Sequence, residues 1–186
     1  MSDKIPCFFL VACEPSGDLL GARLMAALKK LLNGNIRFEG VGGERMQAEG
    51  MKPLFQQSEL ALFGLFELLP KIPHVLKRLS ETIAAAKRIR PDAVVTIDGP
   101  DFSFRLAKAL KGEGIPLIHY VAPTVWAWRP GRAKKIADIY NHLLAILPFE
   151  PPYFEKVGLP CTFVGHTVME QGADKGDIER FYIDMQ

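Results

Sequence analysis

Two carboxylates follow short apolar runs of this sequence and could take part in proton transfer or substrate binding. Asp98 comes directly after the run 93–97, and Glu14 comes directly after the run 7–13. A carboxylate at the end of a buried strand is partly desolvated, and this makes it a better proton acceptor than an exposed one. Asp98 is therefore a candidate general base, although an Asp here can instead cap the next turn. Glu14 is a candidate hydrogen-bond acceptor for a substrate.

Small residues after the same runs suit tight turns at helix starts. Gly17 permits close contact between a strand and a helix, and the turn 40–43, which includes Gly42, either offers N–H groups to an anion or is an ordinary turn. Ser16 could contact a substrate, but Ser16 or Asp18 could equally cap the helix. Asp101 is expected at a helix start. The spacing is not G-x-G-x-x-G, which disfavours a nicotinamide or flavin dinucleotide enzyme.

The segment 126–135 combines aromatic and cationic side chains. Trp126 and Trp128 offer flat faces that suit sugar rings, and Arg129 and Arg132 could bind a phosphate. A solvated basic helix start is the competing interpretation, chiefly for the lysines at 134 and 135. Single-stranded nucleic acid also binds such clusters, but one short cluster in a nearly neutral chain supports it weakly.

The segment 60–69 is apolar on almost every side and is followed by cationic residues from Lys71 to Arg78. It is too short to span a bilayer but could lie in its interface. A buried helix or an oligomer contact explains the pattern equally well. The residues of the membrane-docking interpretation are Leu60, Leu62, Phe63, Leu65, Phe66, Leu68 and Leu69.

Composition restricts the class of protein. The chain has 186 residues, a formal charge of +2 and 48% hydrophobic residues, which excludes global disorder and gives no general reason to expect nucleic acid. Cys7, Cys13 and Cys161 are too few and too scattered for a disulfide framework or a zinc site. A reducing cytoplasm is the simplest compartment.

Apolar runs alternate with helical patterns along the chain. Strands are expected at 7–13, 37–41, 93–97, 117–121, 143–147 and 162–164, and helices at 18–32, 44–49, 59–90 with a break at Pro70, 104–112, 132–140 and 152–157. Most runs are continuously apolar, as in parallel strands covered on both faces. This order predicts an α/β fold with a doubly wound, mainly parallel sheet, whose ligands bind beyond the carboxyl ends of the strands.

Six motifs in order resemble one bacterial family, the lipid-A-disaccharide synthases. They are Val11-Ala-Cys-Glu-Pro-Ser-Gly-Asp-Leu-Leu-Gly21, Gly40-Val-Gly-Gly43, Ile97-Asp-Gly-Pro-Asp-Phe102, His119-Tyr-Val-Ala-Pro-Thr-Val-Trp-Ala-Trp-Arg-Pro-Gly-Arg132, Leu147-Pro-Phe-Glu150 and Phe163-Val-Gly-His166. The Trp-Ala-Trp-Arg-Pro-Gly-Arg run is highly specific, whereas Cys13 stands where the family usually has glycine.

The resemblance implies an inverting glycosyltransferase of the two-domain GT-B architecture. Its reaction moves 2,3-diacylglucosamine from a UDP carrier to the 6-hydroxyl of 2,3-diacylglucosamine 1-phosphate, with no cofactor or metal. Asp98 matches the family's proposed general base. The resemblance also implies peripheral attachment to the cytoplasmic face of the inner membrane, and a homo-oligomer is possible. Substrate binding is assigned to Glu14, Ser16, Gly17, Gly42, Asp101, Trp126, Arg129 and Arg132.

The resemblance also suggests the domain organisation. Residues 1–170 are expected to form a Rossmann-like acceptor-binding domain, and residues 171–186 a linker and the start of a C-terminal donor domain that binds the UDP-sugar. The 186 residues alone are then expected to be inactive. The alternative is a non-catalytic membrane-docking module that binds an acylated sugar phosphate.

Overall fold

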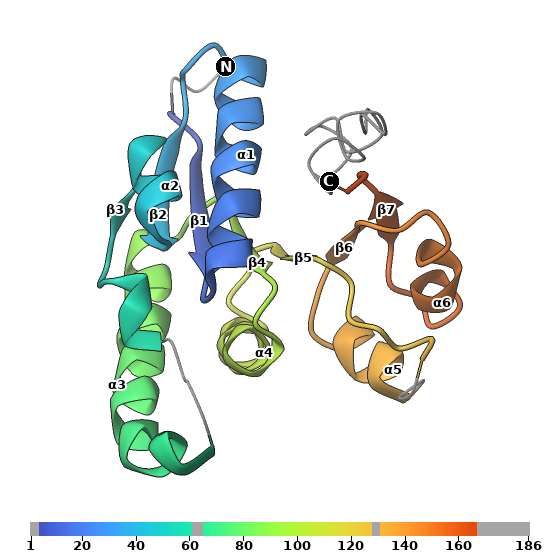
Figure 1. Cartoon of the computed structure of the whole chain (residues 1–186). Helices are drawn as coiled ribbons and strands as arrows, with labels where there is room; N and C mark the ends of the chain where they lie inside the picture. The colour runs from blue at the N-terminus through green and yellow to red at the C-terminus, as the bar shows by residue number, and fades with distance from the viewer. Residues whose placement is uncertain (1–3, 61–64, 128–130, 167–186) are drawn as a thin grey trace, which may run out of the picture.

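The computed structural model describes residues 4–60, 65–127 and 131–166. Strands of this part form one seven-stranded sheet, in which every pair is parallel and the order is β3-β2-β1-β4-β5-β6-β7 (Figure 1). The strands are β1 (Cys7–Ala12), β2 (Arg37–Val41), β3 (Lys52–Pro53), β4 (Ala93–Ile97), β5 (Leu117–Tyr120), β6 (His142–Ala145) and β7 (Cys161–Phe163). The predicted doubly wound α/β fold is confirmed. β3 was not predicted, because a two-residue strand shows no apolar pattern.

Helices cover both faces of this sheet. They are α1 (Pro15–Leu31), α2 (Glu44–Ala48), α3 (Leu65–Ile89), α4 (Pro100–Leu110), α5 (Gly131–Ala137) and α6 (Pro151–Glu155), with a 3-10 turn, η1 (Gln57–Leu60). Side chains alternate between faces along a strand. Leu10 therefore packs in one core with Met25 of α1, while Phe9 packs in the other with Leu106 of α4. Burial on both sides explains why the strands are apolar without alternation.

Two helices begin earlier than predicted, because a proline takes the first position of each. α1 begins at Pro15 rather than at Asp18, and α4 begins at Pro100 behind Gly99. The fixed φ of proline suits the first helical residue, which has no intrahelical use for an N–H group. Asp101 is consequently the second residue of α4 and not its cap.

The predicted break at Pro70 is wrong, since α3 runs through it to Ile89. An interior proline disfavours a helix, but here tertiary packing decides, because Val75, Leu79 and Ile83 repeat every four residues and pack on the core. Among the described residues, no helix combines the length and apolar character that a membrane span needs.

Asp18 caps a helix other than its own. Its carboxylate accepts hydrogen bonds from the backbone N–H groups of Gly43, Arg45 and Met46, at 2.8, 3.0 and 3.1 Å. The side chain is buried, and a Cβ on Gly43 would lie 2.7 Å from its Oδ2 atom. The anion at the turn 40–43 is thus supplied by the chain itself, which replaces the interpretation of Ser16 or Asp18 as the cap of α1.

We expect Asp18→Ala to lower the free energy of unfolding by about 2–4 kcal/mol, because buried N–H donors at the start of α2 lose their acceptor. Asp18→Asn keeps one acceptor oxygen and should lose less. Urea unfolding measures both. Asp138→Ala, which removes an exposed carboxylate, is the control and should stay within about 0.5 kcal/mol. Equal stability of Asp18→Ala and the control would contradict the cap.

Candidate functional site

Asp98 lies at the point where the strand order reverses. β1 and β4 are neighbours in the sheet, and their crossovers leave in opposite directions, which opens a crevice beyond their carboxyl ends. Asp98 follows β4, and Ser16 belongs to the segment that follows β1. The Ser16 hydroxyl donates to Asp98 Oδ2 at 3.4 Å. The fold therefore brings together two residues that are predicted for the same site and lie 82 positions apart.

The backbone holds Asp98 in a conformation that non-glycine residues rarely adopt, with φ at 51°. Its N–H donates to the Tyr120 carbonyl at 3.0 Å, and its carbonyl accepts from the Ser103 hydroxyl at 2.7 Å. Backbone strain of this kind is characteristic of functional sites. Among the described residues, its carboxylate bonds to no backbone N–H of α4 and is not the cap of that helix. It is half-buried and directed toward Ser16.

Cys13, the departure from the family pattern, packs behind Asp98. A Cβ on Gly99 would lie 3.1 Å from the Cys13 Cβ atom, so this tight contact and its φ of 52° both favour glycine there. Burial raises the pKa of Cys13 to about 12, and the nearby carboxylates act in the same direction. The thiol is therefore neutral and contributes packing, not a nucleophile.

A buried hydrogen-bond network connects Ser103, which bonds to the Asp98 carbonyl, with side chains of β4 and β5. The Tyr140 hydroxyl donates to the Ser103 carbonyl at 3.1 Å and lies 2.9 Å from the Thr96 hydroxyl. Thr96 in turn lies 2.8 Å from Nδ1 of His119. Burial lowers the pKa of His119 to about 3, so the imidazole stays neutral. His119 thus positions the core and does not act as an acid.

Gln57 fixes the loop that carries Glu14, and the sequence analysis missed it. Its side-chain amide donates to the carbonyls of Ala12 and Glu14, at 2.9 and 3.0 Å. These partners lie 45 and 43 residues away, so no local pattern could have identified them. The side chain of Glu14 is exposed beside this anchor and is free to meet a ligand.

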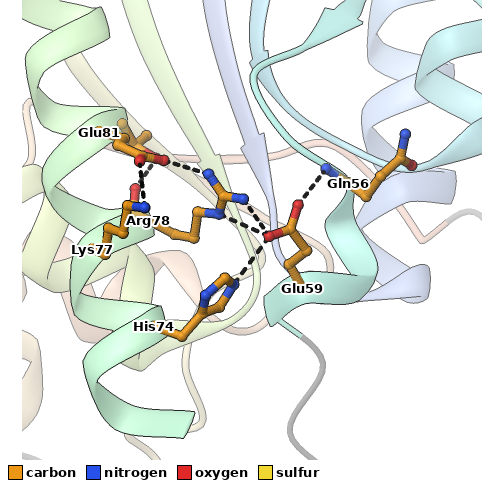
Figure 2. Close-up of polar contacts among 7 residues, drawn as sticks. Gln56, Glu59, His74, Lys77, Arg78 and Glu81 are labelled. Atoms are coloured by element: carbon orange, nitrogen blue, oxygen red, sulfur yellow. Dashed lines mark hydrogen bonds and ion pairs between the residues drawn. The ribbon is translucent and has the colours of Figure 1, made fainter.

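Figure 2 shows how the segment that carries Gln57 is tied to α3. Glu59 accepts hydrogen bonds from His74 at 3.0 Å and from Arg78 Nε at 2.8 Å. Arg78 also donates to Glu81 at 2.6 Å, and its guanidinium lies 4.9 Å from the Phe55 ring centroid. Hydrogen bonds from Arg78 hold the pKa of Glu59 below its usual value. The guanidinium is therefore satisfied within the chain.

A pocket of about 470 Å³ with several polar side chains in its lining opens beside the loop after β1. Its lining includes Cys13, Pro15, Arg45, Gln56, Gln57 and Ser58. The pocket thus adjoins the segment that holds Glu14 and Ser16. Carboxamide, hydroxyl and guanidinium groups at one concave surface suit a polar, hydroxyl-rich ligand.

Other predicted residues near the loop have packing roles that the structure explains. Gly17 is buried, and a Cβ there would lie 3.2 Å from the Ile97 carbonyl oxygen. Gly42 is also buried, and a Cβ there would lie 2.6 Å from Met46 Sδ. Asp101 is exposed in the first turn of α4. Contact between these positions and a substrate stays a prediction.

The aromatic and cationic segment is partly described. Trp126 is 42% exposed, meets Phe149 edge to face at 5.3 Å and lines a pocket of about 390 Å³ with Tyr153. Arg132 lies over the Phe104 ring at 5.2 Å. Trp128 and Arg129 lie outside the described residues.

Glu150 is buried behind Trp126 and was noted in the sequence only as part of a motif. Burial raises its pKa, while hydrogen bonds from the Leu147 N–H and the Trp126 side chain oppose the rise. The Leu147 N–H donates at 3.0 Å. Glu150 therefore holds the β6–α6 turn and the indole in place.

The structure describes few side chains of the predicted membrane-docking segment. Leu62 and Phe63 lie outside the described residues, and for Leu65, Phe66, Leu68 and Leu69 the structure describes the α3 backbone alone. Leu60 is buried in the core. Further along α3, Ile72 and Leu76 are 40% and 46% exposed, four residues apart. The start of α3 lies beyond the carboxyl end of β1 (Figure 1).

Within the described residues, no group of three or more histidine, cysteine or acidic side chains is arranged to hold a metal ion.

The fold and the placement of Asp98 define a doubly wound α/β domain with a carboxylate at the switch point of its sheet. Residues 8–182 match the family described as Lipid-A-disaccharide synthetase. The chain belongs to this family, which is a family of glycosyltransferases.

Curated relatives agree with the family match. The chain is 63% identical over 175 residues to a protein of Rhodospirillum centenum named lipid-A-disaccharide synthase, covering 93% of this chain and 44% of that protein. Proteins of the same name from Ruegeria pomeroyi and Paramagnetospirillum magneticum are each 51% identical, with 89% and 94% of this chain and 42% and 45% of those proteins covered. The chain therefore spans less than half the length of these relatives.

We expect Gln57→Ala to accelerate backbone hydrogen exchange in residues 13–18, because the loop loses two hydrogen bonds that contribute about 0.5–1.5 kcal/mol each. Gln57→Glu should behave similarly, since a carboxylate cannot donate to the two carbonyls. Hydrogen exchange read by mass spectrometry compares both variants with Gln56→Ala, the exposed neighbour. Unchanged exchange in Gln57→Ala would remove its positioning role.

Proposed function

We propose that this chain forms the acceptor-binding part of a lipid-A-disaccharide synthase. The reaction transfers 2,3-diacylglucosamine from UDP to 2,3-diacylglucosamine 1-phosphate and yields the β-1,6-linked disaccharide 1-phosphate and UDP. The observation that carries the proposal is Asp98, held in a left-handed backbone conformation at the switch point and bonded to Ser16. Family membership supports the choice of substrates.

The chemistry that this geometry supports is a single inverting displacement. Asp98 accepts the proton of the acceptor's 6-hydroxyl as that oxygen bonds to C1 of the donor sugar. The bond between C1 and the UDP oxygen breaks on the opposite face, and UDP leaves with the electron pair. Ser16 orients the carboxylate by donating to one of its oxygens, which leaves the other for the hydroxyl.

Substrate contacts are proposed for the loops around this carboxylate. Glu14 and Asp101 expose carboxylates that can accept hydrogen bonds from sugar hydroxyls. Trp126 offers a half-exposed aromatic face held by its neighbours. Arg129 and Arg132 add positive charge for a phosphate. A second domain, corresponding to the part of the relatives that this chain does not cover, would supply most of the UDP-sugar site.

Peripheral attachment to the cytoplasmic leaflet of the inner membrane completes the proposal. Acylated substrates reside in a bilayer, and the apolar segment 60–69 is followed by exposed Ile72 and Leu76 on α3. Lys77 lies exposed on the same helix, and its positive charge suits anionic head groups. The same surface supports a second candidate, a non-catalytic membrane-docking module that binds an acylated sugar phosphate.

Substitution of Asp98 discriminates between the two candidates. A chimera joins this chain to the remainder of the Rhodospirillum centenum relative, and mass spectrometry follows disaccharide formation from both substrates. We expect Asp98→Asn to lower turnover about 10²–10⁴-fold, because a general base is lost. Asp138→Asn, at an exposed position, is the control and should retain turnover.

Undiminished turnover of Asp98→Asn would remove the base assignment. The same assay with the 186-residue chain alone should give no product. Product from that chain would contradict the need for a second domain, and no product from the unsubstituted chimera would favour the docking module.

The membrane surface has its own test. We expect Leu65→Glu combined with Leu68→Glu to release the chain from vesicles that contain phosphatidylglycerol, because two charges oppose burial in the interface. Leu31→Glu, at a 76% exposed position on α1, is the matched control. Cosedimentation measures binding. Unchanged binding of the double variant would assign the segment to the core or to an oligomer contact.

A further inference from the structure

The pocket beside the loop after β1 holds a cation for which the described residues provide no side-chain partner. Arg45 is exposed on α2 and lines this pocket. Among the described residues, its guanidinium forms no hydrogen bond or ion pair, whereas Arg78 is held by two carboxylates. A planar guanidinium with free N–H groups matches the oxygens of a phosphate.

Hydrogen bonds hold the backbone of Arg45 in place, although its guanidinium has no partner in the part of the chain that the structure describes. Its backbone N–H donates to Asp18 Oδ2 at 3.0 Å, and two neighbouring N–H groups donate to the same carboxylate. Asp18 belongs to α1, which begins directly after the loop that holds Glu14. The cation is therefore anchored to the element that carries Ser16, the partner of Asp98.

The other groups around the pocket are compatible with an anion. The Asp18 carboxylate is already satisfied by three N–H donors. Glu44 also lines the pocket, but among the described residues no ion pair joins its carboxylate to the Arg45 guanidinium. Gln56 and Ser58 offer neutral donors and acceptors for sugar hydroxyls.

We propose that this pocket binds the phosphate-bearing end of the acceptor sugar and that Arg45 binds the phosphate. The inference rests on the proposed function and extends it to a residue outside the predicted site. In a hexose ring, C1 carries the phosphate and C5 carries the reacting 6-hydroxymethyl group, and both carbons flank the ring oxygen. A base and a cation that both adjoin the start of α1 therefore suit two groups on the same edge of one sugar.

Arg132 is the competing cation, because the sequence predicts it for substrate binding. It lies over the Phe104 ring at 5.2 Å, on α5, which follows β5. Arg45 follows β2, and its pocket adjoins the start of α1, which carries Ser16. Phosphate binding by Arg45 and phosphate binding by Arg132 would thus occur at different loops of the same sheet edge. Substitution of each residue distinguishes these two hypotheses.

The test uses the 186-residue chain and the soluble probe glucosamine 1-phosphate. Two-dimensional NMR should report saturable shifts in residues 43–47 and 56–58. Arg45→Gln should raise the dissociation constant about tenfold or more, because a charge-assisted hydrogen bond is lost. Arg45→Lys should keep part of the affinity. Arg88→Gln removes an exposed charge elsewhere and is the matched control.

Three results would overturn the proposal. They are unchanged affinity of Arg45→Gln, a loss of affinity in Arg132→Gln alone, and no saturable shift at these residues with millimolar probe. Glucosamine without the phosphate should bind more weakly and identifies the charge as the cause. In the chimera, Arg45→Gln should raise KM for the acceptor and leave kcat nearly intact. If the chimera forms no disaccharide, the proposed function fails, while the binding measurement still decides the role of Arg45.

Discussion

All-parallel pairing is the constraint on which the rest of this structure depends. Because the seven strands run in one direction, their carboxyl ends meet at one edge, and every loop that follows a strand opens there. The reversal of strand order between β1 and β4 then leaves a crevice between two of these loops. Asp98 and Ser16 meet in that crevice because of topology, although 82 residues separate them.

Polar groups near this edge of the sheet hold the backbone of its loops by hydrogen bonds. The left-handed backbone at Asp98 is unfavourable for a residue with a side chain. It is retained because Tyr120 and Ser103 bond to its two backbone polar groups. Asp18 serves the neighbouring loop in a similar way, since its carboxylate satisfies N–H groups that would otherwise be free to bind a ligand. The Asp18 carboxylate thus has a structural role at this edge of the sheet, whereas the Asp98 carboxylate can contact a substrate.

Sequence patterns were informative where the cause is local. The apolar strand 93–97 and the carboxylate after it were predicted, because a run buried on both faces has a recognisable composition. The helix start at Pro100 was missed because its cap, Gly99, has no side chain to recognise. Gln57 and the partners of Asp18 could not be predicted, since those contacts join residues 25–45 positions apart. The path of α3 through Pro70 depends likewise on packing.

These contacts link the surface of α3 to the candidate base. Arg78 and His74 on α3 hold Glu59, which lies two residues after Gln57. Gln57 in turn holds the carbonyls of the loop that leads to Ser16. Each step is a hydrogen bond or a short stretch of backbone, so the loop beside Asp98 is set by helix packing as well as by the strands. A chain of hydrogen bonds therefore joins the helix that carries the exposed Ile72 and Leu76 to the carboxylate at the switch point.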